Sequence, residues 1–189
     1  MNPSAPETRD QILRATLALL AEEGTAALSN RRIAAAADVA AGTLTHHFPD
    51  QAVLLRESLL LYVTEEVARL DAVAAALRAR EPGPAEVAVE IEALIGRPGG
   101  GPLAEFELHL QAARDPELRE TSARCFAAYE SVATAALELL GVSDPSRHAS
   151  AFVALVTGLS IRRLGTDATD TDAVTSALLT LLRGAMADD

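Results

Sequence analysis

The chain has 189 residues, of which 49% are apolar and only 3% aromatic, so its core must be built mainly from aliphatic side chains. A net charge of −11 argues against a protein that binds nucleic acid over its whole surface. The first 56 residues nevertheless carry five arginines against six acids, so DNA binding by the N-terminal part is compatible with the charge distribution.

The sequence does not indicate a membrane protein or a secreted protein. No apolar run approaches the roughly 18 residues that a membrane span requires. The N-terminus is polar and lacks the basic start and apolar stretch of a secretory signal, so we expect a cytoplasmic protein without a membrane partner. The single cysteine, Cys125, is expected to be a buried and inert thiol, and no cofactor or metal is expected.

Helical periodicity dominates the chain, and no segment alternates as a convincing strand would. Glycine and proline mark the ends of the periodic segments, for example at Gly24 and at Pro82-Gly83-Pro84. We therefore predict an all-α fold of about nine helices. They span residues 7–23, 29–36, 40–47, 51–80, 84–95, 103–113, 116–140, 145–164 and 171–187.

The strongest functional signal is a predicted helix-turn-helix. Two short helices, 29–36 and 40–47, are separated by a turn of three to four residues around Asp38. Small alanines let the two helices approach closely, and in this motif the second helix enters the major groove of DNA. The apolar residues spaced to point inward together are Ile33, Ala34, Val39, Leu44 and Phe48.

The helix-turn-helix region also carries an ordered set of residues, namely Gly24, Ser29-x-Arg31-x-Ile33-Ala34, Val39, Gly42-x-Leu44, His47-Phe48-Pro49 and Leu54. Through these residues the sequence resembles the TetR family of bacterial transcriptional regulators. The stretch from Glu105 to Arg119 also resembles one C-terminal subtype of that family.

The resemblance implies a homodimer that binds a double-stranded DNA operator and usually represses transcription. It implies a helix-turn-helix DNA-binding domain at residues 1–50 and an effector-binding and dimerisation domain at residues 51–189. A small-molecule effector would tilt the predicted helix 51–80, and the two DNA-binding heads would then no longer match their half-sites.

Four positions depart from the family pattern. Asp38, Ala40, Thr45 and Gln51 stand where the family usually has a glycine, a capping serine, an aromatic residue and a phosphate-binding lysine. These departures keep a second hypothesis open, namely a helical small-molecule sensor or binding protein with a weakened or lost DNA head.

The resemblance and the positions on the two short helices predict eight DNA-contacting residues. Each of them has a plainer interpretation as a surface or packing residue. They are Ser29, Arg31, Arg32, Gly42, Thr43, Thr45, His46 and His47.

The effector pocket is expected between the fourth and eighth predicted helices. Its wall would be mostly aliphatic, so we expect an apolar or amphipathic effector. Glu105 and His109 share one helix face and would serve as polar anchors or as two metal ligands, although a solvated pair is the simpler interpretation. The pocket candidates, which plain core packing would also explain, are Phe106, His109, Leu110, Phe126 and Tyr129.

The last two predicted helices are amphipathic, and the family implies that they pair with their mates in a four-helix bundle. A core formed within a single chain is the alternative. The predicted interface residues are Phe152, Val153, Val156, Leu159, Leu178, Leu182 and Ala185.

An enzyme is not expected. The sequence has no glycine-rich phosphate loop, no cluster of metal ligands and no nucleophile in a Gly-x-Ser-x-Gly motif.

Overall fold

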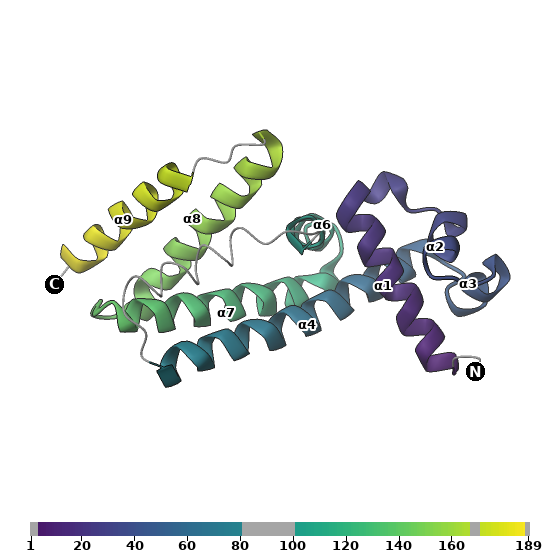
Figure 1. Cartoon of the computed structure of the whole chain (residues 1–189), viewed down its shortest axis with the longest axis horizontal. Helices are drawn as coiled ribbons and strands as arrows, with labels where there is room; N and C mark the ends of the chain where they lie inside the picture. Colours follow the sequence, from purple (N-terminus) through teal and green to yellow (C-terminus); the bar gives the residue numbers. More distant parts are fainter. Residues whose placement is uncertain (1–3, 81–100, 167–170, 188–189) are drawn as a thin grey trace. The chain divides into compact units, whose positions relative to one another are not determined.

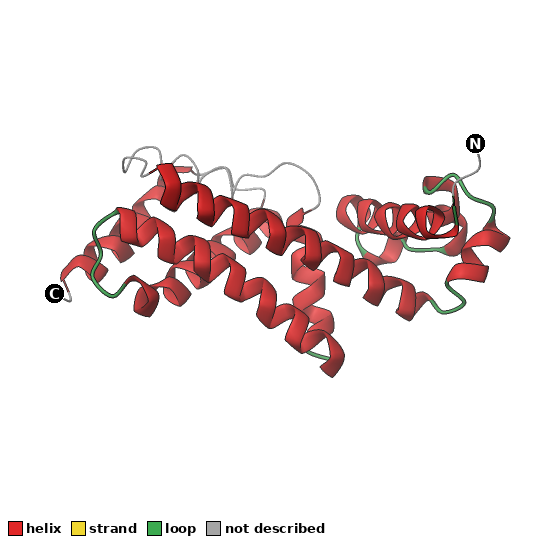
Figure 2. Ribbon diagram, turned by 90° about the horizontal axis from the view of Figure 1, so that it is seen from below, coloured by secondary structure: helices red, strands yellow, loops and turns green. Residues whose placement is uncertain are grey.

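The computed structural model describes residues 4–80, 101–166 and 171–187, with the side chains of residues 101, 102, 171–175 and 187 excepted. Over these ranges the backbone forms only helices and loops, as Figure 2 shows. The predicted all-α class is confirmed. The predicted helix at residues 84–95 lies outside the described residues.

The described helices follow the predicted order and are labelled in Figure 1. They are α1 (Ala5–Glu23), the short 3-10 helix η1 (Thr25–Ala27), α2 (Asn30–Ala36), α3 (Ala41–His47), α4 (Gln51–Arg80), α6 (Gly101–Ala112), α7 (Pro116–Leu139), α8 (Pro145–Thr166) and α9 (Thr171–Ala187). The sequence missed η1, and it ended the eighth helix too early. Gly165 does not take a left-handed conformation, so α8 continues through it to Thr166.

The first helix has clear start and stop signals. At its start the carboxylate of Glu7 accepts a hydrogen bond of 2.6 Å from the backbone nitrogen of Ser4, which satisfies one of the free donors of a helix N-terminus. At its end Gly24 has φ of +75°, a conformation that glycine adopts at little cost. Gly24 therefore ends α1 as predicted.

By its contacts the chain divides into two compact units. The first comprises Met1–Glu65 with Pro98–Ser122, and the second comprises Glu66–Arg97 with Ala123–Asp189. Helices α4 and α7 each contribute residues to both units. The functional division after residue 50 stays a prediction.

In the first unit α1 packs against α2 and α6, and α2 packs against α3. Through α1, the helix-turn-helix formed by α2 and α3 is therefore connected to α6. The largest fully buried side chains of this unit are Ile12, Leu20, Ile33, Leu44, Leu54, Leu59, Val63 and Leu108.

In the second unit α4 and α7 pack along each other through aliphatic side chains (Figure 1). Leu70, Ala74 and Leu77 recur at helical spacing on α4 and face Ala128 and Val132 of α7. Small alanines bring the helix axes close together, and the leucines fill the space between them.

Two further sequence predictions bear on this framework. Cys125 is fully buried, as expected. Among the described helices, none is both long enough and apolar enough to span a bilayer.

Candidate functional site

The turn between α2 and α3 is closed by backbone hydrogen bonds. The nitrogen of Val39 donates to the oxygen of Ala34 at 2.9 Å, and the nitrogen of Asp38 donates to the oxygen of Ala35 at 3.2 Å. Asp38 has φ of +51°, in the left-handed region that aspartate tolerates better than most residues. Asp38 therefore fills the position where the family usually has glycine and keeps the turn geometry.

The two short helices differ in how they begin. The hydroxyl of Ser29 accepts a hydrogen bond of 3.4 Å from the backbone nitrogen of Arg32, so α2 has the predicted cap. Ala40 stands at the same position before α3 and offers no side-chain acceptor. A missing cap costs about 1 kcal/mol, so α3 depends on its packing for stability.

That packing comes from the predicted inward residues. Ile33, Ala34, Leu44 and Phe48 are buried, and Val39 is half-buried. The guanidinium of Arg9 lies 5.0 Å from the centroid of the Phe48 ring, so a cation–π contact from α1 also holds the end of α3. Arg9 is held in turn by an ion pair with Glu57 of α4.

The residues predicted to contact DNA lie mostly at the surface of α2 and α3. Thr43 and His47 are half-buried, and His47 lies against His46 and Phe48. Whether these residues contact DNA stays a prediction. The exposed members are Ser29, Arg31, Arg32, Gly42, Thr45 and His46.

The two arginines of α2 have different surroundings. Arg31 makes no side-chain hydrogen bond or ion pair within the part of the chain that the structure describes. Arg32 forms a two-point ion pair with Glu23 at the end of α1, and its Nη1 donates to Oε2 at 3.0 Å. These hydrogen bonds lower the pKa of Glu23 and raise the pKa of Arg32. A phosphate would bind Arg31 directly, whereas it would compete with a carboxylate for Arg32.

The exposed face of α3 offers close access to its backbone. A Cβ atom built on Gly42 would meet no atom within 4 Å, so the packing of the chain itself does not require a glycine there. The hydroxyl of Thr45 donates to the carbonyl oxygens of Ala41 and Gly42 at 3.2 and 3.1 Å. The hydroxyl hydrogen of Thr45 is therefore used within the chain, whereas its methyl group and the acceptor capacity of its oxygen remain for other contacts.

Gln51 makes a contact that sequence reasoning missed. Its Nε2 donates to the backbone oxygen of Leu28 at 2.5 Å, across 23 residues of sequence. The side chain that stands at the family's lysine position thus joins the start of α4 to the segment between η1 and α2. No local pattern in the sequence signals this bond.

A second missed contact joins α4 to the start of α7. Nε of Arg56 donates to Oδ2 of Asp115 at 3.1 Å, and its Nη1 donates to Oε2 of Glu117 at 2.9 Å. Asp115 also accepts a hydrogen bond of 3.0 Å from the nitrogen of Glu117 and so caps α7. Because one guanidinium holds both acids, the start of α7 is tied to α4 within the first unit.

The predicted effector residues fall in both units. Phe106, His109 and Leu110 belong to the first unit, and Phe126 and Tyr129 belong to the second. All of them except Leu110 are half-buried, whereas Leu110 is 56% exposed. Their joint role as one pocket stays a prediction.

His109 has polar surroundings in the first unit. Its Nδ1 lies 2.8 Å from Oγ of Ser122, and its Nε2 lies 3.8 Å from a carboxylate oxygen of Glu105. Three polar side chains therefore meet between α6 and α7. Among the described residues no group of three or more His, Cys, Asp or Glu side chains gathers as a metal site would require.

Tyr129 belongs to a buried polar cluster of the second unit that the sequence did not reveal. Its hydroxyl donates to Oε1 of Glu66 at 3.0 Å, and Arg69 donates to both oxygens of Glu66 at 3.0 and 2.6 Å. Glu66 is only 3% exposed, so these partners compensate its lost hydration. The cluster places a charged group beside the aliphatic packing of α4 and α7.

The predicted dimer residues divide by burial. Phe152, Val153 and Ala185 are buried within this single chain, and their role at a dimer interface stays a prediction. The other four, Val156, Leu159, Leu178 and Leu182, are half-buried. The sequence missed the large apolar residues that are more exposed on the same two helices, which are Ile161, Leu164, Leu179 and Met186.

Comparison with known proteins identifies the family of this chain. The family model of bacterial regulatory proteins of the tetR family matches residues 12–57, and the model of the tetracyclin repressor-like C-terminal domain matches residues 82–187. The HTH-type transcriptional repressor KstR of Rhodococcus jostii (strain RHA1) is 33% identical over 140 residues, which is 71% of this chain. The chain spans about half the length, 55%, of that relative.

Solved structures agree over nearly the whole chain. The multidrug binding protein EbrR complexed with imidazole superposes with a TM-score of 0.65 at 31% identity, covering 95% of this chain and 96% of the other. A TetR family member from Streptomyces coelicolor A3 gives a TM-score of 0.65 at 31% identity, covering 93% and 98%. Sequence models, a relative and solved structures coincide, and the chain belongs to the TetR family of bacterial regulatory proteins.

Proposed function

We propose that this chain is a DNA-binding transcription regulator that works in the cytoplasm as a homodimeric repressor and catalyses no reaction. The observation that carries the proposal is the helix-turn-helix, whose predicted contact residues are mostly exposed. Arg31 is the clearest candidate, since its guanidinium has no partner in the described part of the chain. A free guanidinium binds phosphate well, and phosphate contacts supply much of the affinity for DNA. Similarity to the repressor KstR supports the same function.

The homodimer is proposed from the exposed apolar side chains of the last two helices. Ile161 and Leu164 of α8 are 55% and 44% exposed, and Leu179 and Met186 of α9 are 44% and 51% exposed. Large apolar side chains grouped on one pair of helices are typical of a protein–protein interface. The same two helices of a second copy would cover them. We propose these four residues as an addition to the half-buried residues predicted from the sequence.

The effector is proposed to be an apolar or amphipathic small molecule. The similar protein EbrR has been solved with ethidium, with proflavin and with malachite green, which supports a regulator that responds to such compounds. For release to follow, the effector must bind the conformation with low DNA affinity more tightly than the conformation with high DNA affinity.

The second candidate function is a sensor whose DNA head is weakened. Two observations favour it, namely the uncapped start of α3 at Ala40 and the amide of Gln51, which hydrogen-bonds within the chain rather than presenting a cation. Both functions predict effector binding. Only the regulator predicts sequence-specific binding of DNA.

The experiment that separates them starts from sheared DNA of the source organism. Bound fragments are recovered with the purified chain, and the enriched fragment is labelled for fluorescence anisotropy. We expect sub-micromolar binding to a two-fold symmetric site and release by an amphipathic compound. If a folded, dimeric preparation enriches no fragment, the sensor replaces the regulator.

A further inference from the structure

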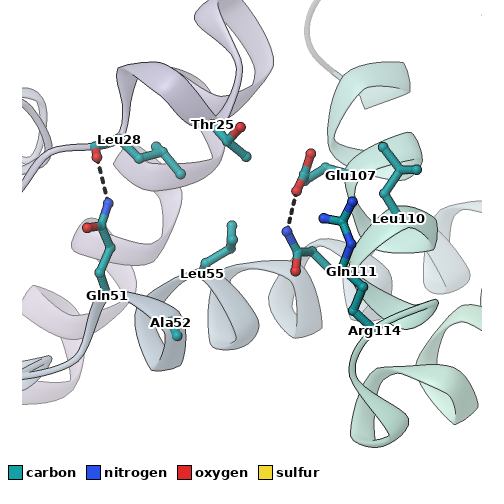
Figure 3. A pocket seen from close by; sticks show the side chains of 9 residues that line it. All are labelled: Thr25, Leu28, Gln51, Ala52, Leu55, Glu107, Leu110, Gln111 and Arg114. Carbon is teal, nitrogen blue, oxygen red and sulfur yellow. Dashed lines mark hydrogen bonds between the residues drawn. The ribbon is translucent and has the colours of Figure 1, made fainter.

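A cleft of about 400 Å³ lies within the first unit, where α6 approaches η1 and the start of α4 (Figure 3). This volume is near the lower end of the range for small-molecule sites, which is about 300–1,000 Å³. The cleft therefore suits a compact metabolite rather than a large drug. Its lining residues are Thr25, Leu28, Gln51, Ala52, Leu55, Glu107, Leu110, Gln111 and Arg114.

One face of α6 and the turn after it supply the polar side of the cleft. Glu107, Leu110 and Gln111 are spaced i, i+3 and i+4 on one face of α6, and Arg114 follows in the turn after Ala112, where its backbone nitrogen donates to the oxygen of Gln111 at 2.9 Å. Figure 3 shows the Arg114 side chain extending from this turn back along α6 towards Glu107. An acid and a base are therefore presented to the same cleft.

The polar groups of this face keep capacity for a ligand. Arg114 makes no side-chain hydrogen bond or ion pair with any residue that the structure describes. Nε2 of Gln111 donates to Oε1 of Glu107 at 2.6 Å, which leaves the second carboxylate oxygen and the Gln111 carbonyl as acceptors (Figure 3). The cleft thus offers a cationic donor and an anionic acceptor at once.

Aliphatic side chains come from both sides of the cleft. Across from α6, Leu28 is buried and Leu55 is half-buried, and on α6 itself Leu110 is 56% exposed. The exposed side chain of Leu110 gains free energy when an apolar group covers it. A ligand with an apolar body would supply that cover.

We propose that this cleft binds a small zwitterion with an aliphatic body, of the chemical class of the aliphatic amino acids. The carboxylate of the ligand pairs with Arg114, its ammonium group pairs with Glu107, and its side chain covers Leu28, Leu55 and Leu110. The opposite charges of Arg114 and Glu107 determine the chemical class of the ligand. A simple carboxylate would be repelled by Glu107 and a simple amine by Arg114, whereas a zwitterion pairs both charges.

The test is direct binding to the full chain, which does not depend on DNA binding and so remains informative if the proposed function fails. The probe is L-leucine, titrated by isothermal calorimetry in low salt. Three comparison compounds each lack one feature: 4-methylpentanoate lacks the amine, 3-methylbutylamine lacks the carboxylate, and glycine lacks the apolar body. Because the cleft is open to solvent, we expect L-leucine to bind with a dissociation constant of roughly 0.1–1 mM.

Variants assign the binding to this cleft. Arg114→Gln should weaken L-leucine at least tenfold, and Glu107→Gln should weaken it while improving 4-methylpentanoate. Arg124→Gln, which removes an exposed arginine of α7 outside the cleft, should leave binding unchanged. Circular dichroism checks that the variants fold, as expected for exposed or half-buried positions. The proposal is overturned if L-leucine shows no binding at a concentration ten times the expected dissociation constant. It is also overturned if 4-methylpentanoate or 3-methylbutylamine binds as tightly as L-leucine, or if Arg114→Gln does not weaken the binding of L-leucine.

Discussion

The substitution Gly42→Ala tests whether Gly42 is needed for DNA binding or for packing within the chain. The two roles predict different changes in DNA affinity and in stability. Gly42 lies in the first turn of α3 and does not have a positive φ, and a Cβ atom there would meet nothing within 4 Å. Alanine stabilises a helix relative to glycine by up to about 1 kcal/mol. The substitution should therefore leave the chain as stable as before or raise its midpoint of thermal unfolding by up to about 2–4 °C.

DNA affinity should fall in Gly42→Ala, although thermal stability is unchanged or higher. If the backbone of α3 approaches DNA at Gly42, the added methyl group occupies space that the DNA needs. We expect at least tenfold weaker binding, which corresponds to about 1.4 kcal/mol. Thermal unfolding measures the first effect, and fluorescence anisotropy on the selected operator measures the second.

A matched control is available in α8. Gly165 also lies in a helix near its end and also leaves space for a Cβ atom, but it lies outside the helix-turn-helix. Gly165→Ala should leave DNA affinity unchanged. If Gly42→Ala binds the operator as tightly as the unmodified chain, α3 does not approach DNA at this residue and the reasoning is refuted.

Four further substitutions test other parts of the account. Arg31→Ala should weaken binding to all DNA sequences alike and reduce the slope of log affinity against log salt by about 1, and an unchanged slope would contradict a phosphate contact. Glu23→Gln should free Arg32 and raise DNA affinity in anisotropy titrations, and a fall in affinity would contradict the competition between carboxylate and phosphate. Leu179→Glu should give monomers in sedimentation velocity, and an intact dimer would place the interface elsewhere. Leu70→Ala should lower the free energy of unfolding in urea by about 2–5 kcal/mol because its side chain is fully buried, and a loss below about 1 kcal/mol would contradict tight packing there.

Local backbone chemistry explains what the sequence predicted well. Gly24 ends α1, Ser29 caps α2, and Asp38 takes a left-handed conformation. Each of these features depends on one residue and its immediate neighbours, so a short sequence pattern is enough to reveal it. The inward residues of the helix-turn-helix follow the helical period for the same reason.

Contacts between distant segments were not predictable in this way. The bond from Gln51 to the Leu28 carbonyl crosses 23 residues, and the ion pair of Arg56 with Asp115 crosses 59. Helical periodicity shows that a charged residue is on a polar face, but it does not show which other helix lies opposite. The sequence therefore identified Gln51 as a departure from the family without showing what its amide binds.

The predicted dimer surface shows a related limit. Phe152 and Leu178 lie on helices with apolar faces, and periodicity alone does not distinguish a face that packs within the chain from one that meets a partner. In the structure Phe152 and Ala185 form one buried cluster with Leu137 and Val142 of the same chain. Leu164 and Leu179 remain exposed and become the better candidates.

The most direct test of the central claim is the salt dependence of binding to the selected DNA fragment, compared with a shuffled fragment of the same composition. We predict that the selected fragment binds at least a thousandfold more tightly than the shuffled one near physiological salt, the lower end of the range for specific DNA-binding proteins. We also predict that its affinity falls steeply as salt rises, because several phosphates are neutralised on binding. Equal and weak binding of both fragments by a folded dimer would contradict the claim that this chain is a sequence-specific regulator.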